Sequence, residues 1–283
     1  MLSELYKEKL YTISQKINEA EVIIVGGASG MSTAAGYNWY KTDENFLKYF
    51  SGFAEKYNID NIFNGFYYRF STKEERWAYI TTLIKFVYDS KVGKPYMDLL
   101  QLLKDKEYFI VTTNQDTQFL KIFPEGKVAA IQGDLRYFQC SQPCHDKVYF
   151  NKEQIEKMYG SIKETRMPTK LIPICPKCGK DLEPWVRSFQ FLEGSLYKSE
   201  LNKYREYLRK SINKKVLFLE LGVGTMTPMF IKEPFWRMTY SWKDASYISI
   251  NPKDAVIPLE IEKKGLAVNE DIAKVLHDLV LNI

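Results

Sequence analysis

Several features that would direct a protein to a membrane or to nucleic acid are absent from this sequence of 283 residues. No stretch approaches the roughly 20 apolar residues that a membrane-spanning helix needs, and residues 1–7 contain no apolar run typical of a signal peptide. The net charge of +5 comes from 40 basic and 35 acidic residues, without a long run of one sign. These absences predict a cytoplasmic globular protein that binds neither a membrane nor nucleic acid.

Cysteine is also scarce, but the four cysteines are grouped in the sequence. They form two close pairs separated by about thirty residues: Cys140 and Cys144, then Cys175 and Cys178. In a cytosolic protein such pairs predict one tetrahedral zinc ion bound by four thiolates, whereas unrelated thiols or disulfides are the alternative. His145 follows the second cysteine directly, and we predict an exposed neighbour because four cysteines already complete the metal's shell.

Short continuous apolar runs, each followed by a polar or glycine-rich turn, recur along the chain. They predict buried parallel strands at 21–25, 108–112, 128–131, 216–221 and 245–250. Apolar residues at helical spacing predict helices over 3–20, 194–211 and 271–280, and a further helix starting near Ser32. Strands that alternate with helices predict an α/β fold with a Rossmann-like parallel sheet, whose ligand lies at the carboxyl ends of the strands.

Two segments interrupt this pattern and predict a smaller inserted module. We assign residues 1–45, 101–133 and 188–283 to the Rossmann-like domain. Residues 46–100 are rich in aromatic and charged residues and predict a helical insertion. The aromatic cluster at 63–70 is predicted to pack between short helices, and a cofactor-binding cluster is the alternative. Residues 134–187 carry the cysteines and predict a zinc module of the ribbon type, whose charged connector (145–174) is predicted to be helical.

The turns that follow the predicted strands contain small and polar residues that suit a dinucleotide. Small residues let the backbone approach a ligand closely, and a helix that begins there directs free N–H groups at it. A single glycine-rich turn is equally compatible with a tight loop. The candidate cofactor residues are Gly27, Ala28, Ser29, Gly30, Ser32, Gly36, Asn114, Gln115, Asp116, Gln132, Gly222, Val223, Gly224, Thr225 and Asn251.

In their order, these turns resemble those of the sirtuin family over most of the chain. Residues 28–32 match the sirtuin G-A-G-x-S loop, and residues 112–116 match its T-Q-N-x-D segment. Residues 222–225 and 250–252 stand where sirtuins have their G-T-S loop and I-N segment, and the cysteine pairs lie between these motifs as they do in sirtuins. The resemblance implies NAD as co-substrate and a structural zinc ion.

The departures from the sirtuin pattern are equally informative. Gln132 stands where sirtuin deacylases carry a general-base histidine, and a carboxamide cannot take up a proton near neutral pH. Arg187 lies in the segment that pairs with substrate in sirtuins, where valine is usual. Residues 36–40 lack the acid and the arginine of the family's G-I-P-D-F-R segment. Neither His145 nor His277 is placed to replace the missing base.

These departures, together with residues 227–236, resemble the class M sirtuins, a microbial branch linked to macrodomain proteins. That resemblance implies an NAD-dependent protein ADP-ribosyltransferase. It also implies that the acceptor is a lipoyl-carrier protein resembling glycine cleavage H, with a macrodomain hydrolase as functional partner.

Transfer of ADP-ribose needs nicotinamide to leave, a stabilised oxocarbenium-like carbon and a positioned acceptor, but no base for a second stage. We therefore predict that Asn114 holds the ribose or a water, and that Asp116 binds the leaving carboxamide or offsets developing positive charge. Gln132 would bond the ribose hydroxyls, and Arg187 would grip an acidic acceptor if it faces the cleft. Asn114 and Asp116 could instead be turn residues at the end of a strand. Gln132 could merely fill space, and Arg187 could be a surface ion-pair partner.

Two other functions stay open. A lysine deacylase or an NAD glycohydrolase would release nicotinamide without labelling a protein. A non-catalytic NAD sensor would bind the cofactor and release no nicotinamide.

Overall fold

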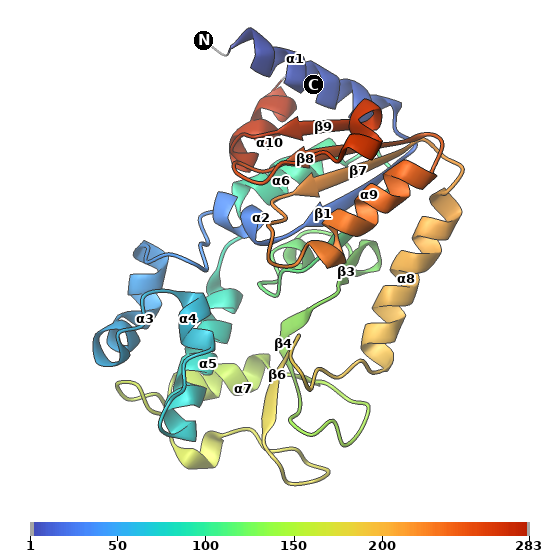
Figure 1. Cartoon of the computed structure of the whole chain (residues 1–283). Coiled ribbons are helices and arrows are strands. Elements are labelled where there is room, and N and C mark those ends of the chain that lie inside the picture. The colour runs from blue at the N-terminus through green and yellow to red at the C-terminus, as the bar shows by residue number, and fades with distance from the viewer. Residues whose placement is uncertain (1–2, 282–283) are drawn as a thin grey trace.

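A computed structural model describes residues 3–281 of the chain. Its largest element is a sheet of six parallel strands in the order β3-β2-β1-β7-β8-β9 (Figure 1). The strands are β1 (Val22–Gly27), β2 (Tyr108–Thr112), β3 (Val128–Ala130), β7 (Val216–Leu221), β8 (Ala245–Ile250) and β9 (Gly265–Val268). In β1, Ile23 and Val25 enter the core on one face, and Val22 and Ile24 enter the core on the other. Burial of both faces explains why the strand reads as one continuous apolar run.

Helices cover both faces of this sheet. One face packs against α1 (Glu4–Glu19), α2 (Ser29–Ala34), α6 (Lys94–Leu102), the short 3-10 helix η1 (Phe119–Lys121) and α10 (Ile272–Leu281). The other face packs against α8 (Ser195–Ser211), α9 (Lys232–Ser241) and the 3-10 helix η5 (Leu259–Lys264). The result is a three-layer α/β arrangement, which confirms the predicted fold class.

A second body, drawn in the lower half of Figure 1, is built from two segments that lie far apart in the sequence. Its helices are α3 (Glu44–Tyr57), α4 (Ile62–Phe66), α5 (Lys73–Asp89), α7 (Lys152–Tyr159) and the 3-10 helix η3 (Thr169–Leu171). Its small antiparallel sheet has the order β5-β4-β6, with β4 (Gly133–Cys140), β5 (Tyr149–Phe150) and β6 (Leu182–Val186). The two segments share one core, in which Trp77 of α5 packs edge-on against Phe138 of β4, with ring centroids 5.4 Å apart.

The predicted strands and long helices are confirmed, with small shifts at their ends. The first strand continues to Gly27, and the third ends at Ala130. The helix expected near Ser32 begins at Ser29 and ends at Ala34. The connector 145–174 is helical only at α7 and η3, so its prediction as a helical segment is right only in part.

The domain boundaries drawn at residues 45, 100, 133 and 187 stay predictions. Within the segment 46–100, α6 packs against α10 in the core of the six-stranded sheet, whereas α3, α4 and α5 belong to the second body. The remaining 3-10 helices, η2 (Glu125–Lys127) and η4 (Pro228–Phe230), lie in the loops before β3 and before α9. None of the described helices combines the length and the apolar character that crossing a bilayer requires.

Candidate active site

A cavity of about 350 Å³ lies where the strands β1, β2, β3 and β7 end. Ligands of open parallel sheets bind at this edge, where the strand-end loops diverge. The predicted site residues that line the cavity are Ala28, Ser29, Ser32, Asn114, Gln115, Asp116, Gln132 and Gly224. The structure thus brings together turns that are almost 200 positions apart in the sequence.

Three of these side chains form a hydrogen-bonded polar cluster, which we define as Ser32, Asn114 and Asp116. Asn114 Nδ2 donates to the carbonyl oxygen of Ala28 at 2.9 Å and to Ser32 Oγ at 3.0 Å. The Ser32 hydroxyl in turn donates to the carboxylate of Asp116, which is only 4% exposed. Burial raises the pKa of Asp116, and the hydrogen bond from Ser32 opposes this rise. The cluster links the turn after β1 to the turn after β2.

Glycines in these turns are required by close packing between loops. A Cβ atom on Gly30 would lie 2.4 Å from the Cα atom of Gly222, and a Cβ atom on Gly27 would lie 2.3 Å from the ring of Phe119. Gly222 also has a φ of +68°, a backbone conformation that residues other than glycine rarely adopt. Gly27, Gly30 and Gly222 do not line the cavity. Their lack of a side chain allows the segments that border it to pack closely.

Gln132 lines the cavity, but Arg187 does not. The carbonyl oxygen of Gln132 accepts a 2.8 Å hydrogen bond from the backbone N–H of Arg187, so the two residues are neighbours through their main chains. The guanidinium of Arg187 instead lies 2.6 Å from Glu193 Oε1, donates to the Tyr197 hydroxyl at 2.8 Å and stacks over the ring of Phe191. A role for Arg187 at the acceptor stays a prediction and would require this ion pair to open.

Four further predicted cofactor residues do not line the cavity. Val223, Thr225 and Asn251 belong to the loops after β7 and β8, and Gly36 follows α2. Asn251 Nδ2 donates to the carbonyl oxygen of Val223 at 3.2 Å, which joins the loop after β8 to the loop after β7. The assignment of all these residues to a cofactor stays a prediction.

One side of the cavity is an aromatic wall, which we define as Trp39, Tyr40, Phe63, Phe66 and Tyr67. Phe66 and Phe70 pack against the core of the second body, as the sequence predicts for the cluster at 63–70. Phe63, Phe66 and Tyr67 of this cluster also line the cavity, which the prediction did not include. A signal for this was present, because positions 63, 66 and 67 share one face of a helix, whereas the buried residues of α4, Ile62 and Gly65, lie on another.

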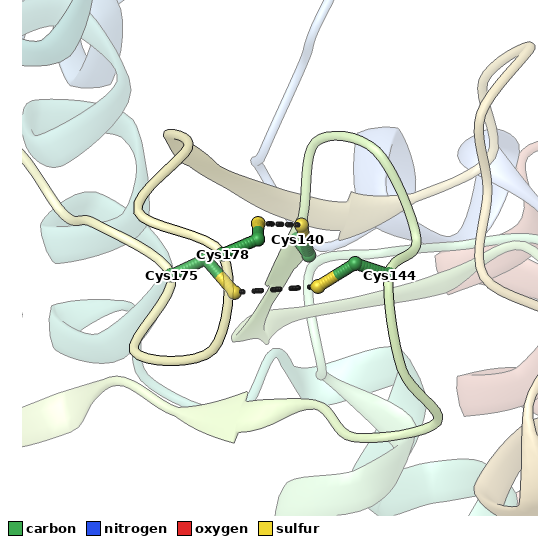
Figure 2. Close-up of side chains that lie close together, drawn as sticks. All are labelled: Cys140, Cys144, Cys175 and Cys178. Atoms are coloured by element: carbon green, nitrogen blue, oxygen red, sulfur yellow. Dashed lines mark hydrogen bonds between the residues drawn. The ribbon is translucent and has the colours of Figure 1, made fainter.

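The four cysteines come together in the second body, as Figure 2 shows. Their sulfur atoms all lie within 4.8 Å of one another, with Cys140 Sγ 3.5 Å from Cys178 Sγ and Cys144 Sγ 3.7 Å from Cys175 Sγ. Thiolates on a tetrahedral zinc ion at about 2.3 Å lie about 3.8 Å apart, so the donor set fits this metal. Burial raises the pKa of Cys140, but hydrogen bonds from the backbone of Cys144 and Gln142 and from the thiols of Cys178 and Cys144 together outweigh it and lower the pKa to about 7.

His145 stands beside the cysteine cluster and outside it. Its Nδ1 atom is 3.0 Å from Cys144 Sγ, and its Nε2 atom is 2.6 Å from the Tyr149 hydroxyl. The side chain is half-buried rather than exposed, which corrects the expectation from the sequence. Its prediction as a neighbour of the metal shell fits the cluster of four cysteines.

The chemistry available at the cavity is that of positioning and charge stabilisation rather than of base catalysis. Among the cavity-lining residues of the described chain, Asp116 is the one carboxylate, and it is already bonded by Ser32 and by the backbone N–H of Gln118. No hydrogen bond to the Gln132 carboxamide occurs within residues 3–281. The cavity can therefore hold a polar group against the polar cluster and an apolar group against the aromatic wall. Its described lining contains no histidine that could accept a proton.

Comparisons with known proteins extend this picture. The chain is 33% identical over 270 residues to a protein named "Protein ADP-ribosyltransferase" from Staphylococcus aureus, covering 94% of this chain and 85% of that one. It is 25% identical over 276 residues to a protein of Fusarium oxysporum f. sp. cubense named "Probable bifunctional ADP-ribose hydrolase/ADP-ribosyltransferase". That match covers 92% of this chain but 46% of the fungal protein. No family model matches the chain.

The fold is similar to that of solved sirtuins. A structure described as that of a Sir2 homolog–NAD complex superposes with a TM-score of 0.62 and 15% sequence identity, covering 96% of this chain and 93% of the other. At this identity the likeness concerns the fold alone. The superposition extends over both the parallel sheet and the second body.

Proposed function

Because this chain belongs to the family of sirtuin-like protein ADP-ribosyltransferases, which are NAD-dependent enzymes, we propose that it transfers ADP-ribose from NAD to a protein acceptor and releases nicotinamide. One observation carries this proposal. The cavity combines the polar cluster of Ser32, Asn114 and Asp116 with Gln132. Side chains suited to hold a nucleotide therefore lie beside a glutamine that cannot act as a general base. The structural zinc ion would be held by the four cysteines, and free thiols of this kind fit the reducing cytoplasm.

The reaction breaks the bond between C1′ of the ribose and the ring nitrogen of nicotinamide, and the bonding electrons leave with nicotinamide. We infer that Asn114 and Ser32 hold the ribose, while Asp116 binds the leaving carboxamide or offsets the positive charge that develops at C1′. Gln132 would donate its amide hydrogens to ribose hydroxyls. An acceptor atom then forms the new bond to C1′ from the opposite side.

The missing base favours a particular chemistry for the acceptor. A lysine or serine must lose a proton when it attacks, whereas the carboxylate of Asp or Glu is already ionised at neutral pH, with a pKa of about 4. A carboxylate therefore attacks C1′ without any proton leaving it. We infer that the acceptor is acidic, which agrees with the absence of a histidine from the described cavity lining.

We propose that the acceptor protein is a lipoyl carrier resembling glycine cleavage H and that a macrodomain hydrolase reverses the modification. The aromatic wall supports the first part, because a cavity lined by Trp39, Phe63 and Phe66 suits an apolar arm on the acceptor. The Fusarium relative is named as joining a hydrolase of ADP-ribose to a transferase, which supports the second part.

The test is to incubate the purified protein with NAD that carries a radiolabel in its adenylate half, together with lipoylated or unlipoylated carrier. Label should appear on the carrier, and hydroxylamine should remove it, since hydroxylamine cleaves an ester of a carboxylate. Nicotinamide release without protein label would instead indicate a glycohydrolase. NAD binding without nicotinamide release would indicate a sensor, and either outcome would contradict transfer.

Replacing Gln132 by histidine is expected to leave lysine deacylation close to the wild-type level. A positioned base contributes about 10²–10⁴-fold to a rate, but an imidazole needs a partner that fixes its orientation. Gln132 has no side-chain partner within residues 3–281, so a histidine there would be unsupported. The measurement is deacylation of an acetylated peptide with NAD, and a gain of 10²-fold or more would contradict the prediction.

A further inference from the structure

A buried charged pair lies on the face of the six-stranded sheet that α9 covers. Glu220 of β7 is 0% exposed and Lys232 at the start of α9 is 4% exposed, and Lys232 Nζ lies 2.7 Å from Glu220 Oε1. From β8, Ser249 Oγ donates to Glu220 Oε1 at 2.9 Å, and the Tyr247 hydroxyl donates to Glu220 Oε2. Taking two charges out of water is costly, and an apolar pair of similar volume is often at least as stable. Stability alone therefore gives no reason for the pair.

The second contact of Lys232 shows what the pair joins. Its ammonium group also donates to the carbonyl oxygen of Asp254 at 2.9 Å, in the loop that follows β8. The same loop is tied to the loop after β7, because Asn251 Nδ2 donates to the carbonyl oxygen of Val223 and Asn251 Oδ1 accepts from the backbone N–H of Asp254 at 3.1 Å. Lys232 therefore links strand β7, helix α9 and the loop after β8 at one point.

The loop after β7 supplies Gly224, Met226 and Thr227 to the cavity lining, and the loop after β8 packs against it without lining the cavity. Gly224 lines the cavity, and a Cβ atom on it would lie 3.8 Å from Asp254 Oδ2, so the loops are in contact there. The polar cluster follows β1 and β2, whereas these loops follow β7 and β8. A change in the spacing of the two loops would thus alter the grip on a dinucleotide without touching the residues beside its reacting bond.

We propose that Lys232 and Glu220 are positioning residues for NAD, which hold the loops after β7 and β8 at the spacing that the cofactor requires before it binds. This inference rests on the proposed function, since it concerns the same NAD. Burial raises the pKa of Glu220, while the charge of Lys232 opposes the rise, as expected for a carboxyl held by a close ammonium group.

The informative variant is the double substitution Glu220→Gln with Lys232→Met. Lys232→Met alone would leave the carboxylate of Glu220 buried without its counter-charge, and this variant can fail to fold for that reason. The double variant has no charge at either of these two buried positions, and the glutamine keeps an oxygen that can accept from Tyr247 and Ser249. It removes the bond to the Asp254 carbonyl, which is the contact that the proposal concerns.

Lys264→Met is the matched control. Lys264 Nζ donates to the carbonyl oxygens of Thr239 at 3.0 Å and Trp242 at 2.7 Å, so this lysine also fastens backbone near α9. Those carbonyls belong to the end of α9 rather than to a loop at the cavity. Its loss should lower the melting temperature and leave NAD binding unchanged.

Three quantities are measured on the wild type and on both variants: the Kd for NAD by calorimetry, KM and kcat for labelling of the acceptor, and the melting temperature. For the double variant we expect Kd and KM to rise about tenfold, the ratio that one lost hydrogen bond of typical net strength produces. Its kcat should stay within about threefold of the wild-type value, since the polar cluster is untouched.

A wild-type Kd and KM in the double variant would overturn the proposal, and so would a fall in kcat at unchanged KM. An equal rise in KM for Lys264→Met would show general loosening and would also overturn it. A wild-type protein that binds no NAD would refute the proposed function itself, and with it this inference.

Discussion

Replacing Asn114 by alanine is expected to lower the rate of ADP-ribose transfer by about 10²–10³-fold, the loss that follows removal of one preorganised donor at a reacting centre. Asn114 Nδ2 holds both the Ala28 carbonyl and Ser32 Oγ, so its loss frees the turn after β1 and removes a partner of the Ser32 hydroxyl. Ser32 in turn donates to Asp116. The change therefore disturbs the whole polar cluster rather than one contact.

The measurement is single-turnover labelling of the acceptor at saturating NAD, with zinc content and melting temperature determined on the same preparation. Asn269→Ala is the matched control, because Asn269 Nδ2 also bonds a backbone carbonyl, that of Ala255 at 3.4 Å, but does not line the cavity. Transfer by Asn114→Ala within tenfold of the wild type, with the zinc retained, would show that the cluster is not the reacting centre.

Replacing Cys178 by serine is expected to release the zinc ion and to unfold the sheet β5-β4-β6. Structural zinc sites contribute an apparent ~10–16 kcal/mol of binding free energy, which is comparable to the whole stability of a typical domain, about 5–15 kcal/mol. The cluster needs all four sulfur atoms, which lie within 4.8 Å of one another. Because β4 and β6 share a core with α5, which also supplies Leu83 to the cavity, transfer should be lost together with the metal.

Metal content by mass spectrometry and limited proteolysis between residues 133 and 187 report on the two parts of this prediction. His145→Ala is the control and should retain one zinc ion per chain, since His145 stands outside the group of four sulfurs. A Cys178→Ser protein that keeps its zinc and resists proteolysis would mean that three cysteines and another group suffice.

The features that sequence alone predicted correctly are those whose signal is local. Strand β1 is buried on both faces, so each of its residues is apolar, small or both, and the run can be recognised without knowing its neighbours. The same holds for the cysteine pairs, because the spacing from Cys175 to Cys178 is set by the reach of two thiolates around one ion. Polar turns such as 113–116 are placed once the strands are placed.

The features that the sequence did not reveal depend on contacts between distant elements. The side of α4 that faces the cavity depends on how this five-residue helix packs against α5, so the sequence alone did not show that Phe63 and Phe66 reach the cavity. The guanidinium of Arg187 is turned toward Glu193 and Tyr197 by the loop that follows β6. The place of Arg187 in the sequence does not show the orientation of its side chain.

The buried pair lies between these two cases. Glu220 interrupts the apolar run of β7, and a charged residue within a fully buried strand signals that a partner must exist. The identity of the partner could not be read from the sequence, because Lys232 stands at the start of a helix whose other charged residues are exposed or half-buried.

The contact between Gly30 and Gly222 has a consequence for how the chain can vary. Each glycine forbids a side chain on the other, since a Cβ atom at either position would lie 2.4 Å from the opposite Cα atom. In terms of mutational tolerance, the two positions behave as one site that spans 192 residues of sequence. Neither a substitution at one position nor a compensating substitution at the other can relieve the clash. A larger residue at either position is therefore compatible with the fold only if the backbone of the two loops moves apart.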